Sequence, residues 1–142
     1  MLEVEPQIID RFVRTGIVRI VVRPLLQTGP DALVASHGAE CAAEQNQFFP
    51  MRSAIYDQQG TVFMNEDKIA ALADIAVSLG MEREPFVACM TSERYNQALY
   101  QGYERATAAG ITNRPVFDIN GTRLVGSQSI EVFTEVVNKF AP

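Results

Sequence analysis

One run of residues carries most of the information about the fold: Gly110-Ile111-Thr112-Asn113-Arg114-Pro115-Val116-Phe117-Asp118-Ile119-Asn120-Gly121. Gly110 is typical of a residue that ends a helix, because glycine adopts the left-handed conformation without a steric penalty. Proline restricts the loop that follows. Asn-Gly is the dipeptide that two-residue hairpin turns prefer. The run therefore predicts the end of a helix, a proline loop and a β-hairpin.

The segments around the turn predict a hairpin followed by a last helix. Two short segments rich in β-branched and apolar residues flank the turn, as paired strands do: Val116–Ile119 and Thr122–Val125. Ser127 or Ser129 can then cap a helix, since a serine oxygen accepts hydrogen bonds from the first free amides. The face of this helix that we expect to point inward consists of Ile130, Phe133, Val136, Val137 and Phe140.

The N-terminal part predicts one helix and one strand. Glu3–Arg14 places apolar residues on one helical face, and Gly16 follows as a stop signal. Ile17–Val22 is short and β-branched, which predicts a strand covered on both faces. The sequence from Pro30 to Ala109 has a helical pattern almost throughout. It contains no repeat or flexible linker, so we expect it to be an insertion within one fold.

Composition excludes several classes of protein. A chain of 142 residues with 47% apolar content suits one compact domain with a sizeable core. The formal net charge of -5 argues against nucleic-acid binding, which needs a basic surface. No apolar run approaches the roughly 18 residues that a membrane span requires. The first residues show neither the basic nor the apolar region of a signal peptide.

Several stretches give the chain a resemblance to a known family. Residues 39–49 are similar to an alanine-rich helix and the aromatic pair after it, and residues 79–90 are similar to the next two helices. Residues 110–126 are similar to a proline loop and closing hairpin. With Glu5–Ile9 in the first helix, these stretches cover nearly the whole chain. In their order and spacing they resemble the DsbA-type thiol-disulfide oxidoreductase family, whose thioredoxin fold is interrupted by a helical domain.

The resemblance implies an α/β, thioredoxin-like fold with an inserted all-helical domain. The expected parts are residues 1–27 (helix and strand), 28–109 (helical insertion) and 110–142 (proline loop, hairpin and C-terminal helix). Family members begin with a strand that leads into Cys-x-x-Cys at the start of the first helix, whereas Met1 falls inside that helix. We therefore expect an N-terminally truncated fold in which the first strand is missing and this chain has no redox cysteine pair.

The resemblance also implies a substrate-facing loop. In the family a cis proline lies against the redox cysteines, and the loop backbone pairs with an extended substrate strand. In this chain we accordingly expect a cis Arg114–Pro115 bond and assign substrate binding to Asn113, Arg114 and Pro115. The alternative for Pro115 is a trans residue that opens an edge strand. In the family a small or β-branched residue usually precedes this proline, whereas this chain has Arg114. The substrate preference of the family is therefore not assigned to this chain.

The two cysteines of the chain, Cys41 and Cys89, do not form a redox motif in sequence. Cys89 begins a Cys-x-x-Ser pattern, but it lies near the C-terminal end of a predicted helix, where the helix dipole disfavours a thiolate. We assign no catalytic residue. The resemblance suggests a structural disulfide between Cys41 and Cys89, since several members carry a cysteine at each place. Two buried free thiols are the alternative.

Metal and cofactor sites are not expected from the sequence. His37 is the one histidine, so the chain offers no second imidazole for a conventional metal cluster. A solvated or capping role for His37 is favoured over catalysis, because no thiol nucleophile is visibly placed beside it. No motif for an organic cofactor is present.

Two functions of different classes fit these observations. In the first, the protein is a disulfide oxidoreductase of protein or peptide thiols whose catalytic residues lie upstream, and the family is typically periplasmic or otherwise extracytoplasmic. In the second, it is a non-catalytic DsbA-like module that binds an extended peptide or its own copy. Loss of the central first strand would leave unpaired backbone groups along two inner edges. Either the two remaining strands close together, or another chain supplies a strand or packs over the gap. We expect the second, in a homo-oligomer or a strand-complemented dimer.

Overall fold

The computed structural model describes residues 3–141 and divides the chain into two compact units. Unit 1 combines the N-terminal residues up to Arg23 with the C-terminal part from Ala106, and unit 2 is Pro24–Arg105. No helix among the described residues is long and apolar enough to cross a bilayer.

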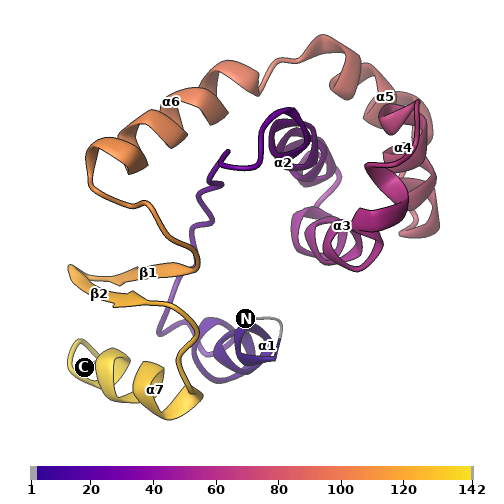
Figure 1. Ribbon diagram of the computed structural model, residues 1–142. Helices are drawn as coiled ribbons and strands as arrows, with labels where there is room; N and C mark the ends of the chain where they lie inside the picture. The colour runs from indigo at the N-terminus through magenta and orange to yellow at the C-terminus, as the bar shows by residue number, and fades with distance from the viewer. Residues whose placement is uncertain (1–2, 142) are drawn as a thin grey trace. The chain divides into compact units, whose positions relative to one another are not determined.

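Unit 2 is built from helices alone (Figure 1). Its largest fully buried side chains are Phe86, Met51 and Leu72, followed by the two cysteines. Gly38 allows a close approach to this core, because a Cβ atom built there would lie 3.3 Å from Leu72 Cδ1. The helices are α2 (Pro30–Ala43), α3 (Phe48–Val62), α4 (Lys68–Ser78), α5 (Arg83–Ser92) and α6 (Asn96–Ala108), the last of which continues into unit 1.

The beginnings of the unit 2 helices follow local chemistry. Proline at the start of α2 suits the first turn, where the backbone amides have no partner within the helix. Asp67 caps α4, since its Oδ1 accepts a hydrogen bond of 2.9 Å from the Ala70 amide. Asn65 lies just before the cap, and its Oδ1 accepts a hydrogen bond from the Asp67 amide. The side chain of Asn65 thus forms the turn that leads into α4.

Unit 1 contains a two-stranded sheet and three short helical elements. Its elements are α1 (Val4–Ile8), the π-helical segment η1 (Ile9–Val13), β1 (Val116–Ile119), β2 (Thr122–Val125) and α7 (Ile130–Asn138). The helices α1 and α7 contact each other (Figure 1). Ile8, Phe12, Ile130, Phe133 and Val137 form the buried cluster of this unit. Phe140, expected on the inward face of the last helix, is 45% exposed because α7 ends before it.

The hairpin forms where the sequence predicts it. β1 and β2 pair antiparallel, and the residue pairs next to the turn are Ile119 with Thr122 and Asp118 with Arg123. Asn120 and Gly121 have φ values of 47° and 90°, which the favoured two-residue hairpin turn requires. The Gly121 amide also donates a hydrogen bond of 2.9 Å to Asp118 Oδ1. Local turn chemistry therefore fixes the register of the sheet.

The strand expected at Ile17–Val22 is absent, which corrects the sequence prediction. The structure gives this segment no regular secondary structure and no hydrogen-bonded strand partner among residues 3–141. It is also not covered on both faces, since Ile17 and Val21 are 50% and 61% exposed. Val18 and Ile20 are half-buried against the unit 1 cluster. The side chains alternate as in a strand that is buried on one side, but no ladder forms without a neighbouring strand.

Candidate functional site

The two cysteines meet in the interior of unit 2. Cys41 on α2 and Cys89 on α5 form a disulfide, with their Cα atoms 5.7 Å apart. The pairing that the family resemblance suggested is therefore present, and the alternative of two free thiols is not. The chain thus holds a cysteine pair that can exist as dithiol or disulfide. The expectation that it has no redox cysteine pair is not borne out.

Burial sequesters this disulfide from large reactants. Cys41 is 1% exposed and Cys89 is fully buried. Thiol-disulfide exchange requires a thiolate to approach one of the two sulfurs directly. A folded polypeptide cannot make this approach in the conformation that the structure shows, so the disulfide crosslinks α2 to α5.

His37 lies beside the disulfide, one helical turn before Cys41. It is only 3% exposed, which corrects the expectation of a solvated or capping histidine. Its ring meets the Tyr95 ring edge-on, with the ring centroids 5.8 Å apart. Its Nε2 atom is buried and has no hydrogen-bond partner among the described residues. Burial lowers the pKa of His37, more than nearby Glu93 and Glu44 raise it, so the imidazole is neutral near pH 7.

The Glu44 carboxylate, at the C-terminal end of α2, holds a hydrogen-bond network. Arg94 Nε donates a hydrogen bond of 2.9 Å to Glu44 Oε1, and a second guanidinium nitrogen contacts both carboxylate oxygens. The Tyr95 hydroxyl donates to Glu44 Oε1 over 2.6 Å. These hydrogen bonds lower the pKa of Glu44, and the same carboxylate raises the pKa of Tyr95. Glu44 therefore fixes the positions of Arg94 and Tyr95 next to the histidine.

The loop assigned to substrate binding lies in unit 1, immediately before β1. Asn113 and Arg114 are exposed and Pro115 is half-buried. The Arg114–Pro115 peptide bond is cis. The Arg114 guanidinium makes no hydrogen bond or ion pair within residues 3–141. The loop thus leads an exposed, basic segment directly into a strand.

The strand β1 has one open edge. The Gly126 amide donates a hydrogen bond of 2.9 Å to the Pro115 carbonyl oxygen, which places Pro115 in a position that faces β2. Because backbone groups alternate in direction along an antiparallel strand, those of Val116 and Asp118 face away from β2. No backbone hydrogen bond to either residue from another strand is present in the described part of the chain. Their N–H and C=O groups are therefore available to another extended chain.

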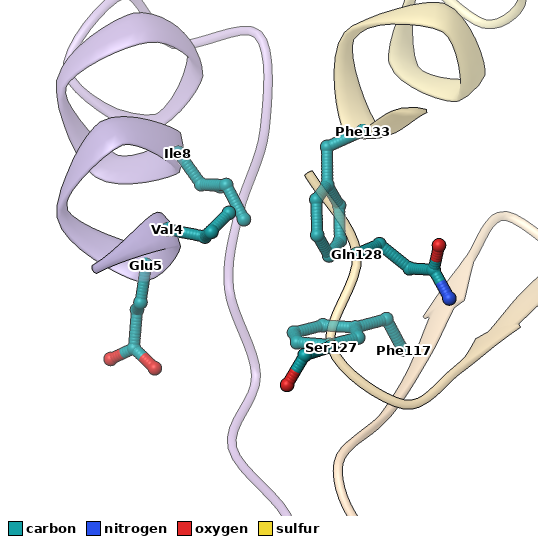
Figure 2. Close-up of a pocket in the computed structure, with 7 residues that line it drawn as sticks. All are labelled: Val4, Glu5, Ile8, Phe117, Ser127, Gln128 and Phe133. Atoms are coloured by element: carbon teal, nitrogen blue, oxygen red, sulfur yellow. The ribbon is translucent and has the colours of Figure 1, made fainter. Parts of the chain in front are cut away.

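A pocket next to this sheet is too small for a substrate. Figure 2 shows its lining side chains, which come from α1, β1, α7 and the segment before α7. Phe117 and Phe133 pack edge to face there, with ring centroids 4.7 Å apart. The cavity volume is about 10 Å³, which is room for a single water molecule. The exposed loop and the open strand edge, rather than this pocket, are the candidate binding features of unit 1.

Sequence reasoning missed the grouping of His37 with the cysteines. His37 and Cys41 are four positions apart, a spacing that puts both side chains on one face of a helix. That spacing was a signal in the sequence that His37 lies next to Cys41. The approach of Cys89 from α5 depends on helix packing, which the sequence pattern does not show. The cysteines lie in unit 2 and the loop Asn113–Pro115 lies in unit 1.

Comparison with known proteins supplies relatives for almost the whole chain. It is 28% identical to the Na⁺/H⁺ antiporter NhaA 3 of Salinispora tropica over 95% of this chain and 20% of the antiporter. It is 27% identical to the Na⁺/H⁺ antiporter NhaA 1 of Salinispora arenicola, with the same shares covered. The antiporter NhaA of Herminiimonas arsenicoxydans is 28% identical over 84% of this chain and 18% of the antiporter. The chain thus spans about a fifth of the length of these relatives.

A solved structure and a family model define the fold and the family. The crystal structure of a candidate protein disulfide isomerase from Nitrosomonas europaea matches with a TM-score of 0.56 at 22% identity. The match covers 76% of this chain and 55% of that protein. The fold is therefore thioredoxin-like, with a small two-stranded sheet and a helical insertion. The thioredoxin family model Thioredoxin_4 matches residues 1–139. Because this match covers nearly every residue, the chain belongs to the thioredoxin family that the model describes.

Proposed function

We propose that this chain is a DsbA-type member of the thioredoxin family that binds extended, thiol-containing polypeptides. Membership of the family implies protein thiol substrates. The observation that carries the proposal is the open edge of β1, which directly continues the exposed loop Asn113–Pro115. A polypeptide that runs along this edge would extend the two-stranded sheet by one strand.

The proposed contacts alternate along the strand. The backbone groups of Val116 and Asp118 would hydrogen-bond to the bound polypeptide, because both face away from β2. Arg114 would contribute a positive charge at the start of the pairing, so polypeptides with an acidic residue at that point would bind better. Backbone pairing supplies affinity for many sequences, whereas Arg114 supplies a preference among them.

A second candidate function, self-association, rests on a separate observation. The irregular segment Ile17–Val22 keeps the alternation of a half-buried strand, but no strand of residues 3–141 pairs with it. A second copy of the chain could therefore contribute a strand to either unpaired segment. Sedimentation tests this candidate: a concentration-dependent dimer supports self-association, and a monomer at all concentrations rejects it.

The transport activity named for the antiporter relatives is not carried over to this chain. The chain corresponds to a fifth of each antiporter and matches the thioredoxin family over that same stretch. The relatives instead favour a setting in which a thioredoxin-family module is part of a longer protein.

The test of peptide binding uses two proline substitutions that differ only in the edge they block. Val116 and Val125 are cross-strand partners, and the backbone groups of both point out of the hairpin, on opposite edges. Proline removes the outward N–H donor at each site and leaves the hydrogen bonds between β1 and β2 intact. Binding of a fluorescent synthetic peptide, with a cysteine flanked by valine and threonine, is measured by anisotropy.

We expect Val116→Pro to weaken peptide binding about threefold to tenfold, which corresponds to the loss of one net hydrogen bond. Val125→Pro should bind as the unmodified chain does, since it blocks only the outer edge of β2. Circular dichroism of both variants checks that the fold is kept. Equal weakening by the two substitutions, or none by Val116→Pro, would contradict pairing at the β1 edge.

A further inference from the structure

Three metal-ligating groups converge in the interior of unit 2. A ring nitrogen of His37 and the sulfurs of Cys41 and Cys89 all lie within 4.8 Å of one another. All three residues are buried, with exposed fractions of 3%, 1% and 0%. Two thiolates and one imidazole form a ligand set that binds Zn²⁺ in preference to harder cations such as Mg²⁺ or Ca²⁺. In the present state the disulfide occupies the sulfur atoms, so no thiolate is available.

In the disulfide-bonded state, one nitrogen of His37 has no partner among residues 3–141. Its Nε2 atom is buried without a hydrogen-bond partner in the described residues. A buried polar atom without a partner costs free energy, and bound metal is one way to satisfy it.

We propose that reduction of the Cys41–Cys89 disulfide creates a Zn²⁺ site formed by Cys41, Cys89 and His37. A dithiol supplies two electrons and two protons, so that the S–S bond breaks, two thiols form and the dithiol becomes a disulfide. Zn²⁺ then binds both sulfurs and the neutral imidazole, and the two thiols release two protons. The disulfide and the zinc site exclude each other, so metal binding reports the redox state of the chain.

The fold suits this exchange because two helices hold the ligands. His37 and Cys41 project from one face of α2 at a spacing of one turn, and Cys89 faces them from α5. Zn–S bonds of about 2.3 Å and Zn–N bonds of about 2.0 Å bring tetrahedral ligand atoms to roughly 3.5 Å apart. Once the S–S bond is broken, the two sulfurs move apart to this spacing, and the imidazole nitrogen already lies within 4.8 Å of them. Glu44 Oε1, 3.6 Å from Cys89 Sγ, is a nearby oxygen for the fourth position.

The experiment compares the full chain in its two redox states. The chain is reduced with dithiothreitol in urea, desalted under argon and refolded, and Co²⁺ or Zn²⁺ is then added. We expect one Co²⁺ per reduced chain with thiolate-to-metal charge-transfer absorption, which Zn²⁺ displaces. The oxidised chain is the matched control, since it has the same sequence, and it should show neither absorption nor displacement. Zn²⁺ should also raise the melting temperature of the reduced chain alone.

Substitution separates the three-ligand site from binding by the cysteines alone. His37→Asn keeps both thiols and removes the imidazole, and we expect Zn²⁺ affinity to fall at least tenfold in the reduced variant. Equal affinity in His37→Asn overturns the proposal, as does a reduced chain that binds no Co²⁺. If the reduced chain is unfolded, refolding on addition of Zn²⁺ supports the site, and continued disorder at saturating Zn²⁺ overturns it.

Discussion

Replacing Cys41 and Cys89 by alanine lowers the free energy of unfolding by about 4 kcal/mol. The reason is the length of the crosslinked loop: the two residues are 48 positions apart, so the disulfide removes much of the conformational freedom of the unfolded chain. Alanine is used because serine would bury a hydroxyl at two sites that are almost fully enclosed. Equilibrium unfolding in urea, followed by circular dichroism, measures the loss.

The single variants provide the control for this prediction. Cys41→Ala and Cys89→Ala each abolish the same bond, so each should lose nearly as much stability as the double variant. The reduced unmodified chain, kept free of metal, should lose a similar amount. A loss below about 1 kcal/mol in the double variant, or strictly additive single losses, would show that the disulfide contributes little to stability.

Phe86→Ala lowers the free energy of unfolding by about 3–5 kcal/mol. Phe86 is fully buried in the core of unit 2, in the same cluster as Met51, Leu72 and Cys89. Removing its ring loses apolar burial and leaves a cavity that these close-packed neighbours cannot fill. The substitution also perturbs the packing around the disulfide, because Phe86 and Cys89 lie on the same short helix.

Tyr100→Ala is the matched control, since it also removes an aromatic ring from a helix in unit 2. Tyr100 is 51% exposed, so its removal should cost less than about 1 kcal/mol. Urea unfolding of both variants at one pH gives the comparison. Similar losses for Phe86→Ala and Tyr100→Ala would mean that the core of unit 2 does not centre on Phe86.

The hairpin was predictable because its information is local. Asn120 and Gly121 determine the turn, and both strands begin and end where the sequence analysis placed them. Ser129 also stands at the N-cap of α7 as expected, although its side chain makes no capping hydrogen bond. Where neighbours in sequence decide the conformation, the sequence was sufficient.

The segment Ile17–Val22 was not predictable in the same way, because a strand exists only when another strand pairs with it. Its β-branched residues favour an extended chain, yet the described residues provide no hydrogen-bonding partner. The grouping of His37 with Cys41 and Cys89 also depends on contacts between distant segments. The four-position spacing of His37 and Cys41 is a local signal that they share a helix face, but only packing shows that Cys89 joins them.

Amide hydrogen exchange tests most directly whether the edge of β1 binds an extended polypeptide. Exchange is followed by NMR on the isotope-labelled chain, with and without a saturating amount of the cysteine-containing peptide. We predict that the amides of Val116 and Asp118 become protected in the complex, because they acquire hydrogen-bond partners. Val125, on the opposite edge, should stay unchanged. Unchanged exchange at Val116 and Asp118 while the peptide is bound would contradict the claim.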